Sequence, residues 1–302
     1  MAGELLAISA TITFVLSSAM FRKVEAYLTS AQISAFRTLV GLITFYIIGL
    51  VSNLFHYALQ ISLNLILLLI VSILAGQVIG DTLYLLAQER IGTSLSIALS
   101  TTFPFFTFFI AYVVRKETVP DNFLVSAALI SIGVIIISQG RVKDNDNIDS
   151  YRNISVTSVL IGLLASIFWG IATVYTDLSL DLVADALPEN VDPTIVGNIV
   201  RFPFAVVALG ALSSKMKKTS FLELDRYSLA WLVGGAVIGT SLGAYLWAES
   251  ARVAGASLSA LVYSSAPLFA LPIGFLLNGE RINIIGFLGS LVTAVGVALI
   301  FI

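Results

Sequence analysis

The chain has 302 residues, of which 58% are hydrophobic and only 11% are charged, and its mean hydropathy is +0.99. A soluble domain carries about 25% charged residues, so this composition excludes a protein whose whole surface faces water and predicts an integral membrane protein. The formal net charge of −2 provides no basic face, and we expect no nucleic-acid partner. Because the sequence has no cysteine and a single histidine, we expect neither a disulfide nor a Cys/His metal site.

Ten apolar segments are long enough to cross a bilayer, which needs about 20 mostly apolar residues per helix. Residues 1–4 lack the basic start of a removable signal, so we expect the first segment to be retained. Continuous apolar runs such as 63–75 do not show the alternation of a β-barrel. We therefore predict an all-α integral membrane protein with ten transmembrane helices. The predicted spans are 5–21, 31–51, 62–87, 93–114, 121–139, 155–176, 194–213, 227–250, 255–277 and 282–302.

An internal repeat relates the two halves of the chain. Shifting the sequence by 163 residues aligns 92–139 with 255–302 without a gap, and eleven of the 48 positions are identical. Six of the identities fall on glycine, serine, proline or glutamate, which general hydrophobicity would not align by chance. They include Gly92 with Gly255, Ser94 with Ser257, Pro104 with Pro267, Glu117 with Glu280 and Gly133 with Gly296. We predict two five-helix repeats at 1–139 and 155–302, joined by a polar linker at 140–154.

Because five is an odd number, the second repeat enters the membrane from the opposite side to the first. Inverted repeats are typical of secondary transporters, in which rocking of the repeats exposes a central site to each side in turn. The serine-rich segment at Ser94, then Pro104 and Glu117, and the counterparts at Ser257, Pro267 and 279–281 resemble the EamA family of the drug/metabolite transporter superfamily. The resemblance covers essentially the whole chain. It implies a cell-membrane transporter, often an exporter, of small metabolites such as amino acids or drugs, without a cofactor.

Two other classes of function stay open. An intramembrane channel or a non-transporting membrane protein is compatible with a helical bundle, although a channel usually shows rings of like residues from identical subunits. Residues 239–243 match the Gly-x-Ser-x-Gly pattern of serine hydrolases around Ser241. That pattern needs a turn between a strand and a helix, with a histidine and an acid to activate the serine. Here it lies within a span and His56 lies in a loop, so we do not expect an enzyme.

Asp81 is the carboxylate that lies deepest in the third predicted span. A charge at this depth is costly and therefore indicates a functional site. Asp81 could carry a coupling proton, pair with an amine of the substrate or form a structural hydrogen bond between helices. Its counterpart in the second repeat is Thr240 or Ala244, depending on the alignment, so any such function is asymmetric.

Arg37 and Arg201 occupy matching places in the second and seventh predicted spans. Each could bind a carboxylate or phosphate of the substrate through two nitrogens. An arginine one or two turns from a helix end can also extend to the lipid headgroups. The two residues therefore predict either a gate or a pair of anchors.

Further polar and aromatic residues punctuate the spans that would surround a central cavity. Pockets for small solutes are mostly apolar and aromatic, with a few polar groups that orient the ligand. Besides Asp81, the residues expected at the substrate or coupling site are Gln77, Tyr84, Thr101, Trp169, Tyr245, Tyr263 and Ser264. Pro104 and Pro267 are expected to break the fourth and ninth helices, where gating would occur.

The segments between the spans give weaker signals. The acidic residues of 177–192 recur at helical spacing, which fits a short amphipathic helix or a vestibule that attracts cations, and we favour a solvated loop. Glu117 and Glu280 are expected to stabilise the starts of the fifth and tenth helices. Lysine and arginine favour the loops that would leave both termini outside, whereas the family resemblance implies cytoplasmic termini. The expected partners are the lipid bilayer, a small-molecule substrate and a coupling proton, with the chain as a monomer or homodimer.

Overall fold

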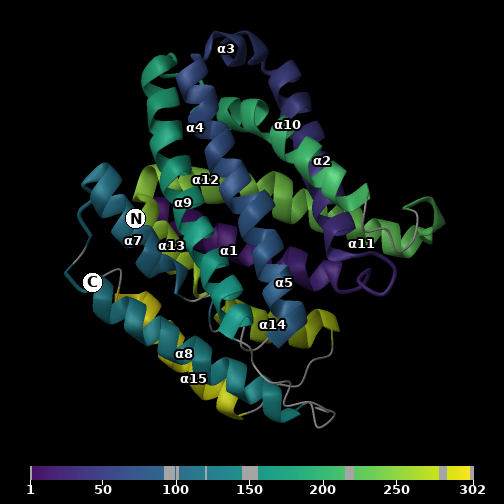
Figure 1. The fold of residues 1–302 in the computed structure, drawn as a ribbon, viewed down its shortest axis with the longest axis vertical. Coiled ribbons are helices and arrows are strands. Elements are labelled where there is room, and N and C mark those ends of the chain that lie inside the picture. Colours follow the sequence, from purple (N-terminus) through teal and green to yellow (C-terminus); the bar gives the residue numbers. More distant parts are fainter. Residues whose placement is uncertain are drawn as a thin grey trace.

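The computed structural model describes residues 2–91, 99, 102–119, 121–144, 156–214, 221–278 and 284–299. Every regular element in these ranges is a helix (Figure 1), which confirms the all-α class. Within them, seven helices are long and apolar enough to cross a membrane, and three shorter apolar helices of 10–17 residues accompany them. The chain is therefore a multi-pass membrane protein.

The helices follow one another in two series. The first series contains α1 (Ala2–Phe21), α2 (Ser30–Val51), the short α3 (Phe55–Gln60), α4 (Leu63–Ile73), the π-helix η1 (Leu74–Gly80), α5 (Asp81–Ile91), α7 (Phe103–Arg115) and α8 (Phe123–Asp144). The second contains α9 (Val156–Ala186), α10 (Pro193–Ser214), the 3-10 turn η2 (Phe221–Glu223), α11 (Arg226–Ala236), the π-helix η3 (Val237–Leu242), α12 (Gly243–Ala254), α13 (Ala256–Tyr263), α14 (Ala266–Asn278) and α15 (Ile284–Leu299).

Local sequence explains where two of these helices begin. Thr29 precedes α2, and its hydroxyl accepts the N–H of Gln32 while the Gln32 side chain accepts the N–H of Thr29. This reciprocal capping box satisfies donors that the first helical turn leaves open. Asp225 precedes α11 and accepts the N–H of Ser228, which is the ordinary role of an aspartate at a helix start.

Two of the long helical rods contain π-helical turns at matching places. The rod 63–91 runs through η1, and the rod 226–254 runs through η3. η1 begins at Leu74 and η3 begins at Val237, 163 positions later, which is the shift that aligns the two halves of the sequence. A π turn interrupts the regular hydrogen bonding of a helix and frequently occurs at a functional site. Asp81 directly follows η1, and Ala244 lies at the equivalent end of η3.

The helices of the two series interleave. α1 packs against α11, η3, α12, α13 and α14 of the second series, whereas α9 packs against α4, η1, α5 and α7 of the first. α2 packs against α10, and α8 packs against α15, which Figure 1 shows side by side along one edge. Each series therefore contributes one helix that completes the packing of the other.

Glycines allow α8 and α15 to approach closely. A Cβ atom on Gly133 would lie 2.6 Å from the carbonyl oxygen of Gly289 and 2.6 Å from the backbone nitrogen of Thr293. On the opposite helix, a Cβ atom on Gly296 would lie 2.9 Å from the backbone nitrogen of Ile130. Small residues are the usual means of bringing membrane helices together. The 163-residue shift converts Gly133 into Gly296 and Ile130 into Thr293, so the two contacts are equivalent, as in an interface with twofold symmetry.

The expectation of a solvated loop at 177–192 is wrong for its first part. α9 has 31 residues and continues to Ala186, so Asp177 and Asp181 lie on the helix. Asp177 is only 1% exposed because Arg115 of α7 packs over it and pairs with it. The four-residue spacing of Asp177 and Asp181 therefore places both carboxylates on α9, where they face Arg115 of α7.

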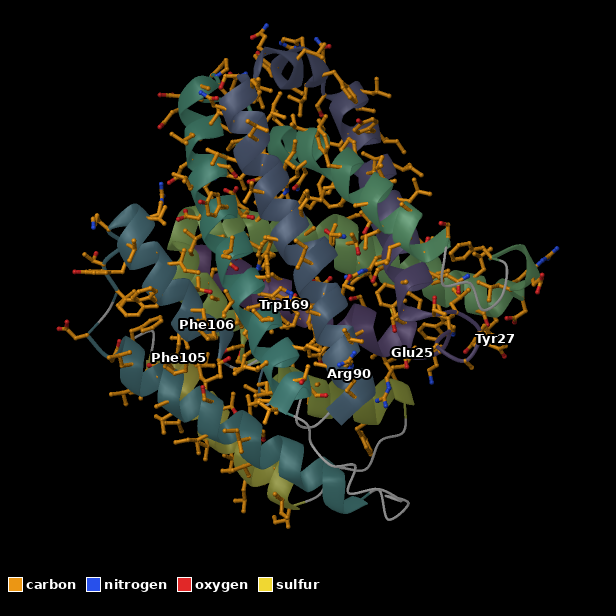
Figure 2. All side chains as sticks on the ribbon, viewed as in Figure 1. Glu25, Tyr27, Arg90, Phe105, Phe106 and Trp169 are labelled. Carbon is orange, nitrogen blue, oxygen red and sulfur yellow. The ribbon has the colours of Figure 1, made fainter. Side chains whose placement is uncertain are left out.

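Apolar side chains cover the outer faces of the bundle, as a lipid environment requires. Val51 of α2, Val207 of α10 and Ile284 of α15 are among the most exposed of them. Figure 2 shows Phe105 at the outer edge of the molecule and Trp169 near its centre. Trp169 belongs to the polar interior described below.

Candidate functional site

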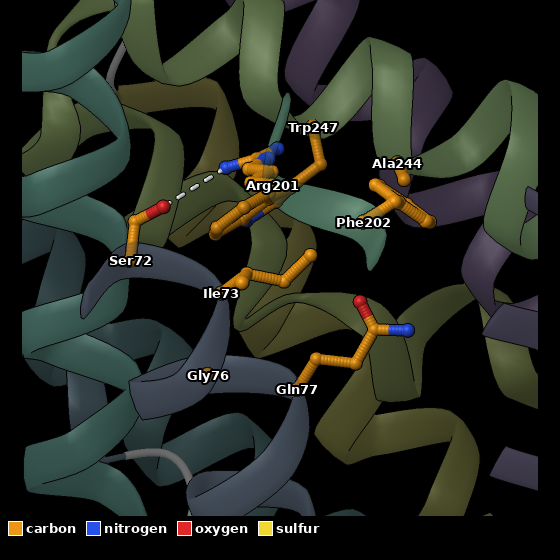
Figure 3. Close-up of a pocket in the computed structure, with 8 residues that line it drawn as sticks. All are labelled: Ser72, Ile73, Gly76, Gln77, Arg201, Phe202, Ala244 and Trp247. Carbon is orange, nitrogen blue, oxygen red and sulfur yellow. Dashed lines mark hydrogen bonds between the residues drawn. The ribbon is translucent and has the colours of Figure 1, made fainter. Parts of the chain in front are cut away.

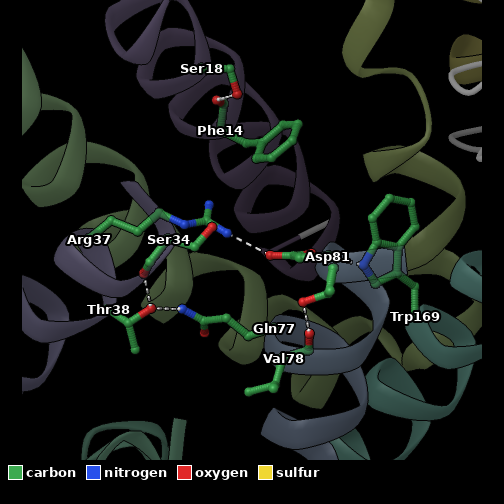
Figure 4. Close-up of polar contacts among 10 residues, drawn as sticks. Phe14, Ser18, Ser34, Arg37, Thr38, Gln77, Val78, Asp81 and Trp169 are labelled. Carbon is green, nitrogen blue, oxygen red and sulfur yellow. Dashed lines mark hydrogen bonds and ion pairs between the residues drawn. The ribbon is translucent and has the colours of Figure 1, made fainter. Parts of the chain in front are cut away.

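An ion pair lies inside the bundle between α2 and α5. Nη2 of Arg37 donates to Oδ2 of Asp81 at 2.5 Å, and the two side chains are 20% and 27% exposed. From α9, Nε1 of Trp169 donates to Oδ1 of Asp81 at 3.0 Å. Figure 4 shows the three side chains converging from three different elements, and we call them the ion-pair cluster. Each oxygen of the carboxylate thus has one directional donor.

The π turn η1 positions the ion-pair cluster. Asp81 is the first residue after η1, and Gly80 is the last residue of the turn. A Cβ atom on Gly80 would lie 2.6 Å from Cδ1 of Trp169, so any side chain there would push the indole away. The Trp169 ring also packs on Tyr84, with centroids 5.2 Å apart, and on Phe103 at 6.2 Å. The glycine and the two rings hold the indole N–H toward the carboxylate.

One turn before Asp81, Gln77 ties η1 to α2. Its Nε2 donates to the hydroxyl of Thr38 at 2.6 Å, and that hydroxyl donates to the carbonyl of Ser34 at 2.7 Å (Figure 4). Gln77 therefore adds a neutral link beside the charged link between Arg37 and Asp81. Both links connect α2 with the rod 63–91.

Gln77 also lines a small pocket between η1, α10 and α12, shown in Figure 3. The pocket has a volume of about 50 Å³. Most of its walls are apolar, and its polar groups are a hydroxyl, an amide and a guanidinium. The lining residues are Ser72, Ile73, Gly76, Gln77, Arg201, Phe202, Ala244 and Trp247.

Arg201 projects from α10 and is only 2% exposed. Its Nε donates to Oδ1 of Asn198 at 2.8 Å, and its Nη1 donates to the hydroxyls of Thr176 at 3.0 Å and Ser72 at 3.3 Å. A headgroup anchor would need the guanidinium at the surface, which this burial does not allow. Arg37 and Arg201 therefore match in sequence but differ in partners, because Arg37 has a carboxylate and Arg201 has neutral groups.

The two remaining predicted tyrosines differ in place. The Tyr245 hydroxyl donates to Oδ2 of Asp192 at 2.8 Å, which directs this side chain to the start of α10. The Tyr263 ring packs on Phe14 of α1, with centroids 5.2 Å apart, and its hydroxyl lies within electrostatic range of Asp81 and Arg37. The structure thus brings Asp81, Gln77, Trp169 and Tyr84 together with Tyr263 nearby, but directs Tyr245 elsewhere.

The predicted helix breaks coincide with helix starts. α13 ends at Tyr263, and α14 begins at Ala266, so Pro267 is the second residue of the new helix. Pro104 is likewise the second residue of α7, where a proline is tolerated because the first turn needs no N–H partner. Ser264 lies in the first of these breaks and donates to the carbonyl of Leu261 in its own helix. Thr101 lies outside the described residues.

Sequence analysis missed an ion-pair network at the end of α7. Nε of Arg115 donates to Oδ2 of Asp177 at 2.9 Å, and Nη2 of Arg115 also pairs with Asp181, one turn further along α9. The four-residue spacing of the two aspartates was visible in the sequence, but their partner lies more than 60 positions away. In the described ranges, no group of three or more His, Asp or Glu side chains could hold a metal ion.

Glu117 caps a helix of the other half. Its Oε1 accepts the N–H of Ser257 at 3.0 Å at the start of α13. Gly255 permits this approach, since its φ is +84° and a Cβ atom there would lie 2.7 Å from Oε1 of Glu117. Burial raises the pKa of the Glu117 carboxyl, and the Ser257 N–H partly opposes that shift. Glu117 thus stabilises α13 rather than the start of α8, and Glu280 lies outside the described residues.

Comparison with known proteins gives a consistent result. The model of the EamA-like transporter family matches residues 1–139 and 156–302. An uncharacterized transporter of Archaeoglobus fulgidus is 25% identical over 279 residues, which cover 92% of this chain and 90% of that protein. A protein crystal structure with 14% sequence identity superposes with a TM-score of 0.76 over 99% of this chain and 96% of the other. That likeness shows a shared fold alone.

Proposed function

Because the chain belongs to the EamA-like transporter family, whose members are membrane transporters, we propose that it is a secondary transporter that exports small metabolites, such as amino acids or drug-like solutes. Residues 1–139 and 155–302 act as two inverted five-helix repeats, and the segment 140–154 connects them. The solute binds between the repeats, and their relative rocking exposes it to each side of the membrane in turn. The transport cycle uses a proton gradient and no cofactor.

The interleaved packing supports alternating access. α1 and α9 each pack on the opposite series, and α8 and α15 meet through the reciprocal glycines Gly133 and Gly296. Two π turns lie 163 positions apart in the rods that face the interior. A structure built from two equivalent halves has two equivalent arrangements, one open to each side, and this is what a carrier requires.

The ion-pair cluster is the feature that most favours coupled transport. Arginine side chains are not deprotonated in proteins, so a proton can change this interaction only by binding to the Asp81 carboxylate. With Asp81 ionised, the 2.5 Å contact holds α2 against α5. A protonated Asp81 no longer attracts the guanidinium as an ion, and α2 is then free to separate from α5. The cluster is therefore a switch that a proton operates.

A carrier also explains Ser241 better than an enzyme does. The Ser241 hydroxyl donates to the hydroxyl of Thr44 on α2 at 2.8 Å, and Ser241 itself lies in the π-helix η3. The single histidine, His56, lies on the short α3 and stacks on its neighbour Tyr57, with ring centroids 3.8 Å apart. The strand and the activated serine of a hydrolase have no counterpart in this arrangement.

Counterflow into liposomes tests the proposed function. Purified protein is reconstituted with an unlabelled solute inside, and the uptake of labelled amino acids and drug-like solutes is measured at two external pH values. We expect wild type to exchange at least one solute with saturation and with a rate that depends on pH. Asp81→Asn should retain exchange but lose its pH dependence, because the proton site is gone.

A matched control is Glu249→Gln. Glu249 is also a paired carboxylate, 2.5 Å from Arg252, but it lies in the second half of α12 and outside the ion-pair cluster. This variant should keep both exchange and its pH dependence. Absence of saturable exchange for every solute would contradict the transport proposal, and unchanged pH dependence in Asp81→Asn would contradict the role of Asp81.

A further inference from the structure

Arg201 is a buried cation that no acidic side chain among the described residues neutralises. Arg37, Arg115 and Arg252 each pair with a carboxylate, whereas the guanidinium of Arg201 donates hydrogen bonds to the neutral side chains of Asn198, Ser72 and Thr176. A buried charge is normally paired with an opposite charge, because leaving water costs far more than neutral contacts restore. Arg201 thus lacks the partner that its environment calls for.

Hydrogen-bond donors around Arg201 also exceed acceptors. A guanidinium has five N–H donors in a fixed fork, and the three contacts of Arg201 involve only Nε and Nη1. Nη2 of Arg201 has no acceptor in the part of the chain that the structure describes. Asn198 is fully buried, accepts from Arg201 with its oxygen, and leaves its Nδ2 without a partner as well. A bound anion in the pocket would supply the acceptor that Nη2 of Arg201 lacks.

The pocket beside Arg201 indicates the kind of anion. Its volume of about 50 Å³ is several times the roughly 10–15 Å³ that one water needs on the same measure, so the pocket has room for a charged group and part of the body attached to it. Ile73, Phe202 and Trp247 form apolar walls next to the guanidinium (Figure 3). A planar carboxylate fits a guanidinium through two parallel hydrogen bonds. The apolar walls suit an aliphatic or aromatic body attached to it.

We propose that Arg201 binds the carboxylate of the transported solute, and that the apolar body of the solute lies against Trp247 and Phe202. This inference rests on the proposed transport function and names its substrate class as amphipathic monocarboxylates. Arg37 cannot serve in the same way, because Asp81 already neutralises it. Gln77 lines the pocket and also bonds to Thr38 beside the ion-pair cluster, so a bound solute lies next to the switch.

Binding to the purified full chain in detergent tests this site without any gradient. The probes are benzoate and phenylacetate, with the neutral amides benzamide and phenylacetamide as matched controls at constant ionic strength. Saturable binding is followed by the rise in unfolding temperature and by the change in tryptophan fluorescence, to which Trp247 at the pocket wall contributes. We expect at least one carboxylate to bind and both amides to fail.

Three variants assign the binding to Arg201. Arg201→Gln should weaken carboxylate binding at least about 30-fold, since one partner of a buried charge pair is lost. Arg201→Lys should bind the carboxylate with an affinity between those of Arg201→Gln and wild type. Ala244→Leu keeps Arg201 but fills the pocket, and it should abolish binding. Arg252→Gln removes an arginine that Glu249 already pairs, and it should bind like wild type.

The inference is overturned if neither carboxylate binds wild type more tightly than its matched amide, or if Arg201→Gln binds the carboxylates as tightly as wild type. If Arg201→Gln does not elute as a folded protein, undiminished binding in Ala244→Leu overturns it. Carboxylate binding without counterflow supports this inference and contradicts the transport proposal. Counterflow of neutral solutes without carboxylate binding contradicts this inference and leaves transport standing.

Discussion

Replacing Gly133 by alanine tests the crossing of α8 and α15, where the two halves of the chain meet reciprocally. The added Cβ atom would lie 2.6 Å from the Gly289 carbonyl oxygen and 2.6 Å from the Thr293 backbone nitrogen, whereas ordinary contacts begin at 3.4 Å. Because backbone atoms cannot rotate away, the helices must separate by about 0.8 Å. Overpacking of this kind costs about 1–3 kcal/mol.

The expected change in unfolding temperature follows from that energy. At about 2 °C per kcal/mol for a chain of this size, Gly133→Ala should unfold about 2–6 °C below wild type. Gly296→Ala should have a smaller effect, because its Cβ atom would lie 2.9 Å from the nearest backbone atom. Gly210→Ala of α10 is the matched control, since nothing lies within 4 Å of its added atom. It should be neutral or stabilising, because alanine favours a helix over glycine by about 0.5–1 kcal/mol.

The assay is thermal unfolding of purified protein in detergent, followed by the loss of the monodisperse peak in size-exclusion chromatography. The three variants should rank Gly133→Ala, Gly296→Ala and Gly210→Ala in increasing stability. If Gly133→Ala is as stable as Gly210→Ala, α8 and α15 do not cross through backbone contact at this glycine, and the reciprocal packing of the halves would be wrong.

Three further substitutions probe the polar interior and the caps. Trp169→Phe keeps the aromatic packing but removes the N–H that donates to Asp81 at 3.0 Å, and thermal unfolding should show a loss of about 1.5–3 kcal/mol. Asp177→Asn weakens the pairing with Arg115 at 2.9 Å and should lower the free energy of unfolding by a similar amount. Burial raises the pKa of Glu117 above its ordinary value of 4.5, so its neutral form is favoured by folding. As pH rises from 4.5, wild type should therefore lose stability relative to Glu117→Gln in unfolding curves recorded at several pH values.

Each of these predictions has a matched control. Trp231→Phe should have little effect, because the buried Nε1 of Trp231 has no hydrogen-bond partner in the described residues. Asp185→Asn and Glu189→Gln remove exposed carboxylates and should change stability by less than about 0.5 kcal/mol. Equal losses in Trp169→Phe and Trp231→Phe would show that the bond to Asp81 does not stabilise the fold. Parallel pH curves for wild type and Glu117→Gln would show that Glu117 does not bury its charge.

Sequence patterns predicted what depends on composition and repetition. Long apolar segments predicted membrane-spanning α-helices, because a backbone that faces lipid must satisfy its hydrogen bonds within its own segment. The 163-residue shift anticipated matching positions in both halves, and the π turns at Leu74 and Val237 follow it. The depth of Asp81 in an apolar span singled it out before its partners were visible.

The partners themselves could not be predicted, because they come from distant parts of the chain. Arg37 and Asp81 were both singled out, yet only the folded arrangement of α2 and α5 shows that they neutralise each other. Arg201 occupies the place of Arg37 in the second half of the chain. It pairs with no carboxylate among the described residues, because the residue equivalent to Asp81 in that half is Ala244 or Thr240. Tyr245 was expected at the site from its residue type alone, and a hydrogen bond to Asp192 directs it elsewhere.

The most direct test of alternating access is the accessibility of position 244 from the two sides of the membrane. The sequence contains no cysteine, so Ala244→Cys introduces a single reactive thiol in the pocket wall. Proteoliposomes are treated with a small membrane-impermeant thiol reagent from outside or from inside, at two pH values. Alternating access predicts that each side can reach the cysteine and that a change of pH raises one rate while it lowers the other. A cysteine reached from one side only, or from both sides with rates that rise and fall together, would contradict a carrier.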